Sequence, residues 1–197
     1  MHNKNINKYQ GIKPASTFII ALLMLIGFNT CFAADSSGIV IQQANISQQK
    51  QTYLLNTDIT YTLNKKVVDA LNNGITLTFN VEIRLVSPRP WIWDKHLNVT
   101  RLPFQIKYNT LAQTYQINDK TNHRKLSFSS LESALHALGT LSDIPLHALS
   151  TEKGSPLIAK LKVYLNIEAL PLPMRPLSYA TPSWHLRSNT YLCPLKP

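Results

Sequence analysis

Residues 157–167 read LIAKLKVYLNI, and an apolar side chain occupies every second position from Leu157 to Ile167. Successive side chains of a β-strand point to opposite faces, so this alternation predicts a strand with one apolar and one polar face. Strands of that kind are typical of antiparallel sheets, whereas the parallel sheets of nucleotide-binding folds are covered on both faces. The stretch therefore predicts an antiparallel, β-rich protein.

The same alternation recurs in three other segments, residues 53–63, 75–85 and 102–108. In the second of these, Glu82 and Arg84 fall on the polar face, where we expect them to contact water. Because four segments share one pattern, an antiparallel arrangement is the expected architecture of the whole domain.

Two short helices are predicted between the strands. Residues 64–73 carry apolar side chains on one side and are followed by Gly74, and glycine commonly follows the end of a helix. The second helix begins after Ser129, which forms a predicted capping box with Glu132, and it ends at Gly139. Its apolar stripe consists of Leu131, Leu135 and Leu138.

The order of these elements predicts an α+β, β-rich fold. We expect an antiparallel sheet or a β-sandwich of about seven to nine strands, with two short helices covering an open sheet face. The length of the chain after its N-terminal segment fits a single domain that buries one core without disulfide bonds.

The N-terminal segment has the layout of a secretory signal peptide. Three lysines precede an uncharged, mostly apolar run at residues 17–28, and the small residues Cys31 and Ala33 follow it. We expect cleavage after Ala33, which separates a signal peptide of residues 1–33 from an exported domain of residues 34–197, periplasmic or secreted. The alternative is an uncleaved anchor in the inner membrane with the domain outside, although the apolar run is shorter than the roughly 20 residues that span a bilayer.

The chain is strongly basic, with 20 Lys and Arg against 10 Asp and Glu, and loss of the three lysines in the signal leaves 17 against 10, a net charge of +7. These charges are scattered instead of forming a basic block, so neither nucleic acid nor a nucleotide cofactor is an expected ligand. Outside the cytoplasm, we expect a protein partner in the cell envelope or an anionic membrane surface. A solvated basic surface without a specific partner is the alternative.

The segment from Pro88 to His96 carries the candidate binding residues. In an extended conformation Trp91 and Trp93 project to the same side, and Arg89 can lie across an indole ring. The favoured interpretation is that the two tryptophans close one end of the core; the alternative is that they bind a sugar or lie at the membrane surface. Asp94 beside Trp93 is interpreted as a turn residue instead of an acid catalyst.

No catalytic constellation is found in the sequence. The histidines lack metal-ligand spacing, no glycine-rich phosphate motif occurs, and no metal or other cofactor is expected. Cys193 is the one cysteine left after cleavage, which predicts intermolecular crosslinking or burial and no internal disulfide. Residues 170–176 hold three prolines, which favours an extended polyproline strip that docks a partner or acts as a stiff connector.

Several of these segments together resemble the exported bacterial proteins of the domain-of-unknown-function family 4390, also described as proline-rich signal peptide proteins. The resemblance lies in Leu71–Ile75, Pro88–Asp94, Tyr108–Leu111, Gln113–Tyr115, Phe128–Gly139, Leu170–Pro173 and Trp184. It implies an envelope protein without an assigned activity, whose genes often lie near a membrane-bound sensor kinase, and therefore a role in sensing outside the membrane.

We therefore predict a non-catalytic exported module that binds a component of the cell envelope. The alternative is a small glycan-binding protein or hydrolase that uses the region of Trp91 and Trp93, with Arg89 and Asp94 beside them.

Overall fold

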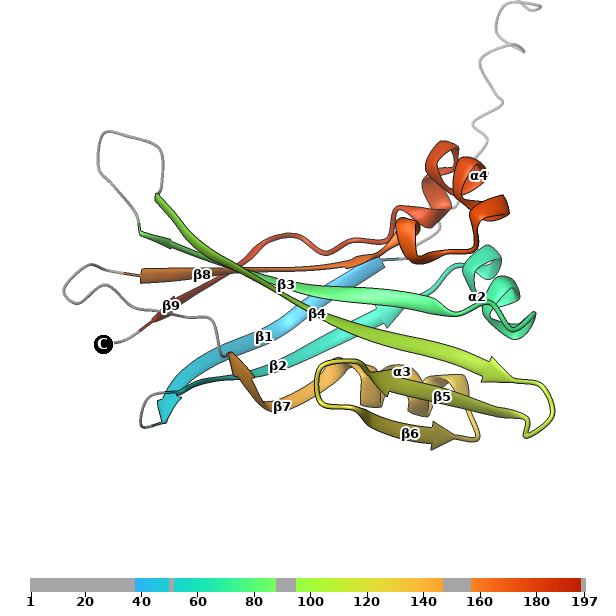
Figure 1. Ribbon diagram of the computed structural model, residues 1–197, viewed down its shortest axis with the longest axis horizontal. Coiled ribbons are helices and arrows are strands. Elements are labelled where there is room, and N and C mark those ends of the chain that lie inside the picture. Colours follow the sequence, from blue (N-terminus) through green and yellow to red (C-terminus); the bar gives the residue numbers. More distant parts are fainter. Residues whose placement is uncertain (1–37, 50–51, 88–94, 147–156, 196–197) are drawn as a thin grey trace, which may run out of the picture. The chain divides into compact units, whose positions relative to one another are not determined.

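The computed structural model describes residues 38–49, 52–87, 95–146 and 157–195, which contain nine β-strands in two antiparallel sheets and three short α-helices (Figure 1). The predicted β-rich α+β fold is confirmed. The strands are β1 (Gly38–Gln49), β2 (Thr52–Thr62), β3 (Leu77–Ser87), β4 (Lys95–Asn109), β5 (Thr114–Asp119), β6 (Arg124–Phe128), β7 (Thr140–Leu146), β8 (Leu157–Leu165) and β9 (Tyr191–Leu195). The helices are α2 (Lys65–Asn72), α3 (Leu131–Gly139) and α4 (Arg175–Ala180), and the 3-10 turns are η1 (Ile167–Ala169), η2 (Leu172–Met174) and η3 (Pro182–Trp184). Within these ranges, no helix is long and apolar enough to span a bilayer.

One sheet has three strands in the order β1-β2-β7, and the other has six in the order β6-β5-β4-β3-β8-β9. Neighbouring strands run antiparallel in both sheets. The four segments predicted from their alternation correspond to β2, β3, β4 and β8; the ends of β2, β3 and β8 agree within two residues, whereas β4 begins seven residues earlier than predicted. The alternation of apolar and polar residues therefore predicted the main strands of both sheets.

Both sheets contribute to one hydrophobic core. Tyr61 of β2 packs edge-on against Phe79 of β3, with ring centroids 5.0 Å apart and ring planes at 63°. Leu55 in the small sheet and Ile83 and Leu161 in the large one are fully buried in the same cluster. Each such side chain stabilises the fold by roughly 1.5–3 kcal/mol. Cys193 of β9 is also buried, which agrees with burial, one of the two alternatives predicted for it beside intermolecular crosslinking.

The polar face of β3 differs from the prediction. Glu82 was expected to contact water, but only 3% of it is exposed, and Thr78 and Asn80 are also buried. The reason is that β3 lies in the centre of the large sheet, where long side chains from β4 and β8 close over it. Only Arg84 on this strand remains exposed.

Helix α2 has a cap at each end. The side chain of Asn64 accepts a hydrogen bond from the backbone N–H of Val67, 3.1 Å away. At the other end Gly74 has φ +81°, the left-handed conformation that glycine adopts without strain. The N–H of Ile75 then bonds the carbonyl of Ala70, which with the bond from Gly74 completes a Schellman motif and confirms the predicted helix end.

Helix α3 begins one residue later than predicted. Ser130, not Ser129, is the N-cap, and its hydroxyl accepts a hydrogen bond from the N–H of Ser133, so the predicted capping box with Glu132 does not form. The helix ends at Gly139 as predicted, but for a different reason. A Cβ on Gly139 would lie 1.9 Å from the carbonyl oxygen of Ile59, so the glycine allows the helix to approach β2 closely.

Residues 170–176 were predicted to form an extended polyproline strip. They instead contain η2 and the start of α4, so this prediction was wrong. Pro173 and Pro176 stand second in η2 and α4, within the first turn, where the missing N–H costs no intrahelical hydrogen bond. A high proline content is compatible both with the first turn of a helix and with an extended chain, so composition alone could not identify the helical turns.

Gly139→Ala should lower the free energy of unfolding by about 2 kcal/mol, because the added methyl group overlaps the backbone of β2. Urea denaturation followed by circular dichroism measures this difference. Gly38→Ala is the matched control, since no atom lies within 4 Å of the added Cβ, and its unfolding midpoint should stay unchanged. Equal midpoints for the two variants would contradict the close packing of α3 on β2.

Candidate functional site

The polar face of the six-stranded sheet gathers basic side chains from four strands. The pairing of the strands places directly opposed residues on the same side of the sheet, so the positions on this face follow from the register. We call these six residues the basic face: Arg84 of β3, Arg101 and Lys107 of β4, Lys125 of β6, and Lys160 and Lys162 of β8.

Glu82 lies at the centre of this face and is held by two arginines. Nε of Arg84 donates to one carboxylate oxygen at 2.6 Å, and Nε of Arg101 donates to the other at 2.8 Å. The hydroxyl of Tyr164 lies 3.5 Å from the second oxygen, and the side-chain amide of Asn80 donates to that hydroxyl at 3.4 Å. The carboxylate is thus fully partnered although it is buried.

Burial of the Glu82 carboxyl by itself raises its pKa, but the hydrogen bonds and charges of Arg84 and Arg101 outweigh this effect. The net result is a pKa below the usual value for glutamate. The side chains of both arginines are about half exposed, at 48% and 57%. One buried negative charge therefore holds two partly exposed positive charges in place, and the surface that they present is positive.

A cleft opens beside this network where the sheet meets the C-terminal helical turns. It has a volume of about 440 Å³ and is lined by Asn80, Arg101 and Tyr164 from the sheet, by Asn166 and Glu168 after it, and by Tyr179 of α4. Asn80 and Tyr164, which are hydrogen-bonded to each other, contribute polar side chains to its lining. The cleft can accept a small anionic or hydroxyl-bearing group beside Arg101.

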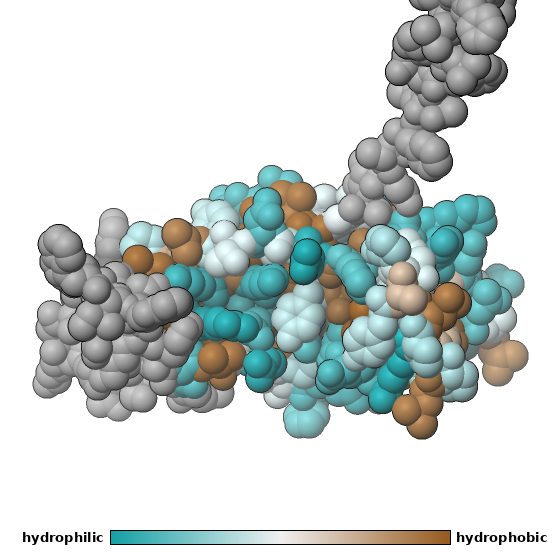
Figure 2. Space-filling view, turned by 90° about the horizontal axis from the view of Figure 1, so that it is seen from above, coloured by the Kyte–Doolittle hydropathy of each residue, from teal (hydrophilic) through white to brown (hydrophobic). Residues whose placement is uncertain are grey.

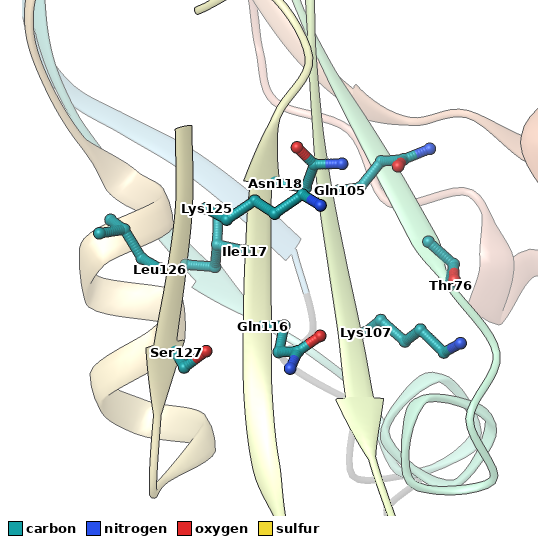
Figure 3. Close-up of a pocket in the computed structure, with 9 residues that line it drawn as sticks. All are labelled: Thr76, Gln105, Lys107, Gln116, Ile117, Asn118, Lys125, Leu126 and Ser127. Atoms are coloured by element: carbon teal, nitrogen blue, oxygen red, sulfur yellow. The ribbon is translucent and has the colours of Figure 1, made fainter. Parts of the chain in front are cut away.

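A second hollow, of about 370 Å³, lies on the same face between β4, β5 and β6. Figure 3 shows Lys125 reaching across β5 to lie beside Asn118, and Lys107 extending from β4 on the side away from β5, while Ile117 and Leu126 point in the opposite direction. The lining also includes the side-chain amides of Gln105, Gln116 and Asn118. Lysines and amides together supply many hydrogen-bond donors, and the carboxylates of an acidic surface are acceptors for such donors.

Figure 2, which views the domain from the side where β8 and α4 lie in Figure 1, shows mostly hydrophilic side chains with a few hydrophobic ones among them. In the described part of the chain, no group of three or more His, Cys, Asp or Glu side chains could hold a metal ion.

The candidate binding residues predicted from the sequence, Arg89, Trp91, Trp93 and Asp94, lie outside the described residues. The basic face itself was missed by sequence reasoning. Its signal is present, because the polar positions of the alternating strands carry paired cations in β4 and β8, but the side-by-side placement of those strands depends on a register that the sequence did not reveal.

The fold and this face define a two-sheet α+β domain with a polar, basic surface on its larger sheet. Residues 36–193 match the profile of a family described as a domain of unknown function, DUF4390, and the chain belongs to that family. The resemblance seen in the sequence is thus confirmed. Comparisons with curated proteins and with solved structures find no match.

Glu82→Gln should destabilise the protein by about 2 kcal/mol at neutral pH, because the charge-assisted hydrogen bonds to both arginines are lost. The lowered pKa sets the pH dependence of this difference. The stabilisation by Glu82 is fully present above the usual glutamate pKa and is lost as the pH falls through the lowered value in the folded state. Thermal unfolding of both proteins between pH 3 and pH 7, about the range over which carboxylates titrate, measures it.

Glu132→Gln on the exposed surface of α3 is the matched control and should change stability little at any pH. If the difference in thermal stability between Glu82→Gln and the parent chain stayed constant across the pH range, the ionised, arginine-bound state of Glu82 would be contradicted.

Proposed function

We propose that this protein is an exported, non-catalytic binding module of the cell envelope that recognises an acidic protein surface through the basic face. One observation carries the proposal: six cations share one side of a sheet with a single buried carboxylate. Such an excess of positive charge attracts an acidic partner and orients it during the encounter.

The rigidity of the face supports recognition as its role. Arg84 and Arg101 are fixed by Glu82 before any partner arrives, so little side-chain entropy remains to be lost on binding. The amides beside Lys107 and Lys125 add directional hydrogen bonds to the attraction between charges. A face of this composition distinguishes partners by the pattern of their acidic groups.

The location outside the cytoplasm is part of the same proposal and rests on the predicted signal peptide of residues 1–33. The resemblance to exported proteins encoded near a sensor kinase suggests the outer part of such a kinase, or another membrane protein, as the partner. No catalytic step, cofactor or nucleic acid is included in the proposal.

Replacing Lys107 and Lys125 by glutamine should lower the recovery of the partner roughly fivefold, because two charges facing it are removed. The measurement is crosslinking in intact cells, followed by purification of the tagged chain and quantification of the membrane proteins recovered with it. Recovery by the parent chain should also fall as the salt concentration rises, since exposed charges are screened.

Gln42→Glu with Gln49→Glu is the matched control, because it lowers the net charge by the same two units at exposed positions of β1 in the other sheet. This control should recover the partner as the parent chain does. Equal losses from the two double variants would show that only net charge matters, and recovery that is indifferent to all four substitutions would refute the basic face as the binding surface.

A further inference from the structure

Apolar side chains project into solvent at the end of the domain formed by η2 and α4. Leu172 is 72% exposed, Leu177 68% and Tyr179 52%, which are high values for residues of this kind. Figure 2 shows hydrophobic side chains at the end of the view where α4 lies. We call residues 172–180 the α4 cap.

The α4 cap is held firmly from inside, so its outward leucines are presented by a fixed backbone. Leu170 and Trp184 on either side of it are buried in the hydrophobic core, and Ser178 within it is also buried. Nε of Arg175 donates to the carbonyl of Leu170 at 2.9 Å. The exposed leucines therefore cannot turn inward without unpacking these anchors.

Basic residues outnumber acidic ones in the segments next to the cap. The side-chain amide of Asn64 donates to the carbonyl of Ser183 at 2.6 Å, which places the N-terminus of α2 beside η3. Together with Arg175 of the cap, α2, η1 and the residues after η3 carry Lys65, Lys66 and Arg187 against Asp69 and Glu168; Lys65 is paired with Asp69 at 2.9 Å, and the excess is two positive charges. An apolar centre with a basic rim matches the interface of an anionic bilayer.

The described chain also begins at this end of the domain. Gly38 pairs with Thr62, which lies two residues before Asn64 and hence close to α2 and η3. Nine residues, 29–37, separate Phe28 from Gly38. In the alternative without cleavage, an anchor at residues 17–28 would therefore be attached to the domain through Gly38, at the end that carries the cap.

We propose that the α4 cap rests on an anionic phospholipid bilayer, with Leu172 and Leu177 inserted at the level of the headgroups and Tyr179 at the boundary. The inference rests on the proposed location in the cell envelope, but it uses another surface than the basic face. The leucines project from the surface instead of lining a groove, and a fluid bilayer accepts projecting side chains whereas a protein partner must offer pockets for them.

The test uses the full chain with Cys31→Ser, so that an introduced surface cysteine reacts while Cys193 stays buried. Leu177→Cys carries an environment-sensitive fluorophore, and the protein is mixed with vesicles of phosphatidylethanolamine and phosphatidylglycerol that contain nitroxide-labelled lipid. Quenching at position 177 should exceed that at the control position Leu192→Cys by about threefold, because Leu192 is similarly exposed, at 57%, but lies on β9 away from the cap.

Leu172→Asp in the chain labelled at position 177 should reduce quenching to the level of position 192, and Leu172→Phe should retain it, since an aromatic ring also favours the interface. Both variants keep the N-terminal segment, so any attachment through that segment is the same in each. Equal quenching at positions 177 and 192, or none at 177, would overturn the proposal.

Two other outcomes would also contradict the contact of the α4 cap with lipid, because they would show that something else covers the cap. A label at position 177 that is shielded from aqueous iodide without vesicles would assign the cap to a segment of this chain. Shielding that occurs in native envelope membranes but never in pure lipid would assign it to a protein. Lys107→Gln with Lys125→Gln should leave the quenching unchanged, so the cap and the basic face can fail separately.

Discussion

Strand β3 is hydrogen-bonded along both edges and covered on both faces, and the rest of the domain is arranged around this constraint. One face supplies the apolar side chains that meet the small sheet in the core. The other face carries Glu82, which lies too deep to be solvated and therefore requires charged donors. Arg84 and Arg101 meet that requirement from the surface, so burial of one acid determines where two cations stand.

The sequence was most informative where structure is local. Alternation along β2, β3, β4 and β8 predicts each strand without reference to its neighbours, and the fold class follows from that repeated pattern. Register is not local. Glu82 and Arg101 are 19 positions apart and become partners only through the pairing of β3 with β4, which neither strand specifies alone. The basic face could therefore not be predicted from the sequence, although Arg84 was placed on a polar face.

The wrong local predictions share a physical cause. Ser129 and Ser130 are both suitable N-caps by residue type, and the helix uses Ser130. Prolines at positions 171–176 satisfy an extended chain and the first turn of a helix equally well, because φ is similar in both. Gly139 was correctly taken as the end of α3, yet its lack of a side chain serves contact with Ile59 and not a left-handed turn. In each case the residue type is compatible with two local structures and does not by itself distinguish them.

The basic face and the α4 cap adjoin each other at Tyr179, which belongs to the cap and lines the cleft that contains Arg101 and Tyr164. This geometry gives the two proposed surfaces complementary roles. A cap seated on a bilayer brings the cleft close to the headgroups and leaves the lysines of β4 and β6 farther along the sheet. An acidic protein segment that emerges from the membrane would then meet the arginine pair first and the lysines next. Attachment to lipid also confines the encounter to the membrane surface, which raises the effective concentration of a membrane-bound partner and allows a modest electrostatic affinity to suffice.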